Sequence, residues 1–149
     1  MAPGAKGDRM LAAIPLLALP VALYNVLMLT ISGGFGGAGA AERLAAPLFS
    51  LRTASRAIWS VSLGDVFMAG ALLILFAELF KAAQSRRIAI VNHSLAMVLF
   101  VICLIEFLLF PAFATSTFFL ITLMVLLDVT AGFMVTIVAG RRDGDFRAD

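Results

Sequence analysis

The sequence contains very little of what a soluble enzyme or a secreted domain relies on: it has one cysteine, one histidine and few charged residues. Because Cys103 is the only cysteine, the chain can form neither an intrachain disulfide nor a thiol-based metal site. Charged residues make up 13% of the chain and hydrophobic residues 62%, and the mean hydropathy is +1.07, which excludes an ordinary soluble domain. The net charge of +2 is too small to indicate a nucleic-acid partner.

The scarcity of reactive side chains also limits the chemistry. A haem held by two histidines would need a second imidazole besides His93, which only another copy of the chain could provide. The sequence contains no Cys-x-x-Cys motif, no metal-ligand spacing and no nucleophile–base pair. It therefore predicts no cofactor, no metal site and no catalytic residue, and an enzyme that uses intramembrane acids for proton chemistry is left as an alternative.

Long apolar runs are what the sequence has in abundance. Residues 88–105 and 107–127 carry no formal charge, and a short corner containing Pro111 lies between the two predicted helices. A helix needs about 20 mostly apolar residues to cross a bilayer, and two further runs of this kind come earlier in the chain. We therefore predict an all-α membrane protein with a single integral membrane domain, built as an up-down bundle of four transmembrane helices. The expected spans are about 10–31, 59–80, 88–110 and 116–140, with polar tails at 1–9 and 141–149.

The first run has an alternative interpretation as a signal peptide, because Lys6 and Arg9 precede it and Ala38-Gly39-Ala40 resembles a cleavage site. Its length of about 22 residues exceeds the roughly 7–15 residues of a signal-peptide core. We therefore expect a permanent span, bent where Pro15 and Pro20 remove backbone donors.

The segment from Glu42 to Ser60 shows helical spacing of Leu44, Leu48 and Leu51, with arginines at the polar positions. This pattern predicts a short amphipathic helix in the membrane interface, interrupted near Pro47, with Trp59 at the level of the lipid headgroups.

The distribution of basic residues predicts the orientation. Eight of the eleven lysines and arginines flank one side of the predicted spans, and the other three lie between residues 42 and 56. Since basic loops stay on the cytoplasmic side, both termini are expected to be cytoplasmic. The third and fourth runs resemble those of small four-span inner-membrane proteins of bacteria, and no activity follows from that resemblance. We expect a multi-pass protein of the cell inner membrane.

Polar side chains inside the predicted spans are the candidate site. Counting along the helices puts Asn25, Asp65 and Glu106 in one layer, within about 10 Å of the outer boundary. Asp128 lies deeper, near the middle of its span. A polar group inside a membrane is costly, so these residues are expected to serve structure or function.

The helical spacing also predicts which faces are buried. Glu106 shares a stripe with Asn92 and Cys103, and Asp128 shares one with small residues such as Gly132. We expect both stripes to face the interior of the bundle, and most phenylalanines to face lipid or a partner. Glu78 is expected to pair with Lys81 or to reach the headgroups.

Two readings of the polar residues stay open. In the structural reading, protonated carboxyl groups and Asn25 form a hydrogen-bonded layer, or Arg52 or Arg56 reaches an acid as an ion pair. In the functional reading, the acids and His93 form a path for protons or cations. The secondary candidates are Asn92, His93, Arg52 and Arg56.

The sequence identifies no substrate. The absence of a soluble domain or catalytic motif, together with thirteen phenylalanines that offer contact surface, favours a structural or accessory subunit of a larger membrane assembly. The alternative is a proton- or cation-coupled channel or transporter that uses the intramembrane carboxylates. The expected partners are the lipid bilayer and other membrane subunits or further copies of the chain.

Overall fold

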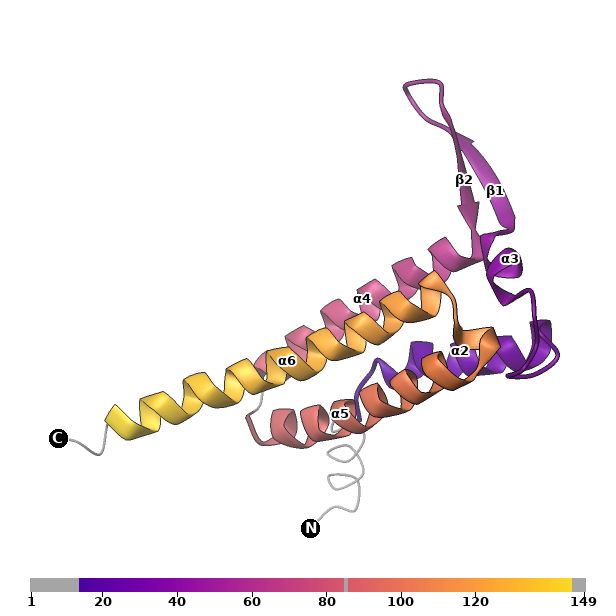
Figure 1. The fold of residues 1–149 in the computed structure, drawn as a ribbon. Coiled ribbons are helices and arrows are strands. Elements are labelled where there is room, and N and C mark those ends of the chain that lie inside the picture. The colour runs from indigo at the N-terminus through magenta and orange to yellow at the C-terminus, as the bar shows by residue number, and fades with distance from the viewer. Residues whose placement is uncertain (1–13, 85, 146–149) are drawn as a thin grey trace, which may run out of the picture.

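The fold was analysed in a computed structural model, which describes residues 14–84 and 86–145 (Figure 1). The described part is mostly helical, and its longest helices are α4 (Leu63–Gln84), α5 (Arg86–Leu109) and α6 (Ser116–Asp145). The predicted polar tail at 1–9 and the last four residues of the other tail lie outside the described residues.

These three helices are long and apolar enough to cross a membrane. The qualifying segments are 19 residues each, Leu63–Lys81, Val91–Leu109 and Ser116–Met134, or about 28 Å of helix against a hydrocarbon core of about 30 Å. They coincide with the second, third and fourth predicted spans. The chain is therefore a helical membrane protein.

The first predicted span is only partly helical in the described residues. Helix α2 covers Ala18–Ile31, and its 14 residues extend over about 21 Å, which is shorter than a full span. The chain turns over residues 14–17, where the amide of Ala18 donates to the carbonyl of Pro15. Pro20 lies in the first turn of α2, where a missing backbone donor costs little. The prediction of a helix from residue 10 is thus wrong for residues 14–17, and residues 10–13 lie outside the described part.

The corner between α5 and α6 is confirmed as a tight connection. Pro111–Phe113 form the short 3-10 helix η1, and the amide of Ala112 donates to the carbonyl of Phe35 at 3.2 Å. This contact ties the corner to the glycine-rich segment that follows α2.

The predicted interfacial helix at 42–60 is wrong beyond its first turn. Helix α3 (Ala40–Ala45) ends before Pro47, and the chain then forms an antiparallel hairpin of β1 (Pro47–Arg52) and β2 (Ile58–Ser62). Proline is tolerated at the first residue of a strand, and the sequence beyond it alternates large apolar with small or charged residues, which suits strands. The described part is therefore mostly helical, consistent with the predicted all-α membrane class, and carries one hairpin that was not predicted.

Helix α6 packs antiparallel to α5 and parallel to α4, with α2 alongside (Figure 1). Aromatic rings fill the core near the corner: Tyr24 packs against Phe113 and Phe118, with ring centroids 5.6 and 4.8 Å apart. All three side chains are fully buried. The expectation that phenylalanines face outward is therefore wrong for this pair, because the corner needs large side chains to fill the space between α2 and α6.

Candidate functional site

Two of the predicted site residues meet at the corner end of the bundle. The side-chain amide of Asn25, on α2, donates to a carboxylate oxygen of Glu106, on α5, at 3.3 Å. The same amide donates to the carbonyl of Val21 one turn earlier, at 3.1 Å. Both side chains are partly buried, so this Asn25–Glu106 pair links α2 to α5 with one interhelical hydrogen bond.

Asp65 does not join that layer. One carboxylate oxygen accepts from the amide and the hydroxyl of Ser62, at 2.8 and 2.7 Å, and the amide of Asp65 donates to the same hydroxyl at 3.2 Å. This reciprocal arrangement is a capping box at the start of α4. Asp65 is exposed, so the predicted three-residue layer contains only Asn25 and Glu106.

The two candidate arginines lie elsewhere. Arg52 ends strand β1 and Arg56 lies in the turn of the hairpin, which projects away from the bundle (Figure 1). Within the described residues, neither arginine forms a salt bridge with Asp65 or Glu106. The predicted ion pair is therefore absent, because the segment forms a hairpin that carries the guanidinium groups away from the helices.

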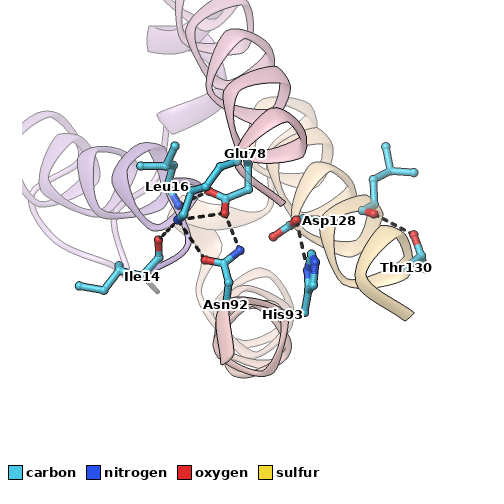
Figure 2. Close-up of polar contacts among 9 residues, drawn as sticks. Ile14, Leu16, Glu78, Asn92, His93, Asp128 and Thr130 are labelled. Atoms are coloured by element: carbon cyan, nitrogen blue, oxygen red, sulfur yellow. Dashed lines mark hydrogen bonds and ion pairs between the residues drawn. The ribbon is translucent and has the colours of Figure 1, made fainter. Parts of the chain in front are cut away.

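Asp128 meets His93 in the interior. Figure 2 shows the two side chains facing each other from α6 and α5, and a carboxylate oxygen of Asp128 lies 3.5 Å from Nδ1 of His93. Asp128 is completely buried and His93 is 8% exposed. We call these two residues the His93–Asp128 pair.

A glycine makes this approach possible. A Cβ atom placed on Gly132 would lie 2.0 Å from Cγ of His93, so any larger residue would collide with the imidazole ring. The buried stripe predicted from Asp128 and Gly132 is thus found on α6, and the ring of His93 packs directly on it.

The polar atoms of the pair have no hydrogen-bond partner among the described residues. Both ring nitrogens of His93 and both carboxylate oxygens of Asp128 are buried and unpaired, because the 3.5 Å contact is an ion-pair distance without hydrogen-bond geometry. Buried unpaired polar atoms are uncommon in folded proteins and call for an explanation.

A second buried cluster, which the sequence suggested only in part, surrounds Glu78 on α4 (Figure 2). Its carboxylate accepts from Lys81 at 3.3 Å, from the side-chain amide of Asn92 at 2.5 Å, and from the backbone amide of Leu16. Lys81 also donates to the carbonyls of Ile14 and of the Asn92 side chain, at 2.6 and 3.2 Å. This Glu78 network joins the segment before α2 to α4 and α5.

The sequence held a signal for this network. The expected Glu78–Lys81 pair is present, and Asn92 follows in the next helix, across the connection between α4 and α5. Two consecutive antiparallel helices bring the end of one beside the start of the next. Asn92, predicted as a secondary candidate, is therefore placed with Glu78 and not with Glu106.

The His93–Asp128 pair and the Asn25–Glu106 pair are separate. On α5, His93 and Glu106 are 13 residues apart, or about 20 Å along the helix. Cys103, which lies between them on the stripe of Glu106, is fully buried in the apolar core. Within the described residues, no group of three or more histidine, cysteine or acidic side chains could hold a metal ion.

Comparison with protein-family models, with curated proteins and with solved structures gives no match to this chain.

Proposed function

We propose that the protein is a structural or accessory subunit of a larger assembly in the cell inner membrane, with four membrane passes and both termini cytoplasmic. The observation that carries this proposal is that the buried polar groups around Glu78 are bonded within the protein. They bond to one another across helices and to the backbone before α2, so they serve to fix the bundle. Interhelical hydrogen bonds of this kind contribute about 0.6–2 kcal/mol each in membranes.

The outward surface of α4 supports the same proposal. Leu73, Phe76 and Phe80 form a stripe along the helix and are 72%, 61% and 59% exposed. The rings of Phe76 and Phe80 pack on each other, with centroids 4.8 Å apart. An ordered apolar and aromatic stripe offers a contact surface to the helix of another membrane subunit, although lipid can also cover it.

The test is purification of the tagged chain from its own membranes in mild detergent. The proposal expects other membrane proteins to co-purify in fixed stoichiometry. Replacing Leu73 and Phe76 together by alanine should reduce this co-purification several-fold. The matched control is the double replacement of Val98 and Val101, which are exposed on α5, and it should have no effect. Recovery of the chain alone, or as a homo-oligomer only, contradicts the proposal.

One observation favours the second candidate function, a proton- or cation-coupled channel or transporter. The His93–Asp128 pair is buried in the bundle with its polar atoms unpaired, and ionisable residues inside membranes commonly mark ion pathways. If this function is correct, the purified chain should carry protons or cations into liposomes. Asp128→Asn should abolish the flux while Glu106→Gln, about 20 Å from the pair, should leave it unchanged. Liposomes that stay tight with the parent protein contradict this candidate.

A further inference from the structure

The hairpin has two chemically different faces. In the register of the strands, Leu51 lies opposite Trp59 and Phe49 opposite Val61, and paired residues share a face. The other face carries the Ser50–Ser60 pair, whose hydroxyls are 2.9 Å apart, and the Arg52–Ile58 pair. The hairpin is therefore amphipathic, with one apolar aromatic face and one mainly polar face.

The apolar face continues outward from the bundle and is uncovered. Val61, next to the helices, is buried, whereas Phe49, Leu51 and Trp59 are 50%, 49% and 56% exposed. None of the three belongs to the core cluster of the bundle or packs against it. Three large apolar side chains side by side on one face of a short hairpin would be unfavourable in water.

The position of the hairpin brings this face to the membrane boundary. Strand β2 ends at Ser62 and α4, one of the three spanning helices, begins at Leu63 without an intervening residue. The capping box of Ser62 and Asp65 fixes this junction. Figure 1 shows the hairpin turning aside from the line of α4. A strand of five residues is about 17 Å long, so the hairpin extends that far from the end of the span.

The far end of the hairpin is basic. Arg52 and Arg56 are exposed, and neither forms a salt bridge within the described residues. Arg56 has a φ of 65°, a left-handed conformation that glycine would adopt without cost.

We propose that this hairpin lies on the lipid surface, with Phe49, Leu51 and Trp59 immersed among the acyl chains next to the headgroups and Arg52 and Arg56 on anionic lipid phosphates. The charges are complementary, and tryptophan is enriched at this level of membranes. Both outer edges of a two-stranded hairpin carry unpaired backbone groups, which water and headgroups can satisfy but hydrocarbon cannot. The hairpin therefore lies in the interface and no deeper. This inference is independent of the proposed function.

The chain contains its own probe, because Trp59 is the only tryptophan. The full chain is reconstituted in vesicles of phosphatidylcholine with phosphatidylglycerol. Nitroxide-labelled lipids should quench Trp59 fluorescence most strongly when the nitroxide is near the headgroup end of the acyl chain. Iodide in the aqueous phase should quench it weakly.

The matched control moves the tryptophan to the neighbouring residue on the opposite face, as Ser60→Trp in a Trp59→Phe background. Its quenching by iodide should be several-fold stronger than that of Trp59. Equal and strong iodide quenching at both positions would show a hairpin in water and overturn the proposal. Protection of both positions from iodide and from the lipid quencher would overturn it as well, because a protein then covers the hairpin.

The arginines are tested through the lipid composition. Replacing phosphatidylglycerol by phosphatidylcholine should increase quenching of Trp59 by acrylamide, an uncharged quencher that the lipid charge does not repel. The reason is that the anionic surface attracts each arginine by about 1 kcal/mol, or roughly fivefold in the equilibrium between seated and unseated hairpin. The double variant Arg52→Gln/Arg56→Gln should no longer respond to this change. If this double variant responds to the change of lipid as the parent does, the arginines do not bind the anionic lipid and that part of the proposal is wrong. Arg43→Gln, on α3, is the control and should respond like the parent.

Discussion

Close packing around single residues decides how α5 and α6 meet. The imidazole of His93 occupies the space in which Gly132 has no side chain, beside the carboxylate of Asp128. Position 132 requires glycine, since the atoms nearest to an added Cβ belong to the imidazole ring of His93 on α5.

Gly132→Ala is therefore expected to destabilise the bundle by about 1–3 kcal/mol through overpacking. The free energy of unfolding can be measured by adding denaturing detergent to mixed micelles. His93→Ala in the same chain should recover most of the loss, because it removes the ring that the new methyl group meets. Gly70→Ala is the control, as a Cβ there would meet no atom, and the variant should be as stable as the parent. Equal effects of the two glycine replacements would show that the ring does not rest on Gly132.

Removal of Glu78 tests the buried network at the same scale. Glu78→Leu should cost about 3 kcal/mol of unfolding free energy, because the amides of Leu16 and Asn92 and the ammonium of Lys81 lose one common acceptor. Glu78→Gln should cost less, since the amide oxygen can still accept one of these bonds. The neighbouring Leu79→Ala, on the more exposed side of α4, is the control. A Leu variant as stable as the parent would mean that water or headgroups satisfy these donors.

Residue-level placement was predictable only where the helix ends were predicted correctly. Counting depth from Ile31 for Asn25 and from Pro111 for Glu106 placed the two side chains at one level, and they are bonded. The same counting failed for Asp65 because it started from Trp59, which lies in a strand, whereas the helix starts at Leu63. Asp65 is consequently a capping residue in the first turn.

At the scale of elements, the apolar run predicts a helix well because a span must be long and almost free of charge. The hairpin was missed since the leucines at 44, 48 and 51 also fit a helical period. Alternation over residues 49–52 and 59–62 was the better signal for this segment. The Glu78 network was only half predictable: of the two expectations for Glu78, the pair with Lys81 is present, whereas the bonds to Leu16 and Asn92 on two other segments were not predicted.

The junction of hairpin and α4 gives a prediction at this scale. Ser62→Ala removes the hydroxyl that accepts from the amide of Asp65, and should lower the unfolding free energy by about 1 kcal/mol. Ser62→Thr keeps the hydroxyl and should retain most of the stability. Amide hydrogen exchange of residues 63–65 should increase in the alanine variant. Unchanged exchange there would show that the capping box does not hold the start of α4.

For the whole molecule, the distribution of basic residues predicts the orientation. Reporters fused before Met1 and after Asp149 should both be found in the cytoplasm, and a reporter inserted near Gly37 should be found outside, because eight of eleven basic residues flank the terminal side. Cysteine accessibility of the inserted site in intact cells provides the second measurement. Because α2 has 14 described residues and is shorter than a full span, this experiment directly tests whether the first predicted span crosses the membrane. A site near Gly37 that is reached only after the cells are opened would contradict four passes.

The direct passage from strand to helix at Ser62 and Leu63 also has a mechanical consequence. No linker separates β2 from α4, and the capping box bonds across their junction. The orientation of β2 is therefore coupled to the orientation of α4. The hairpin and α4 consequently cannot tilt independently of each other. With the hairpin in its proposed place on the lipid surface, lateral pressure in the headgroup layer would exert a torque on it. This torque would be transmitted to α4, and through the close approach of Gly64 to Thr117 it would reach the start of α6.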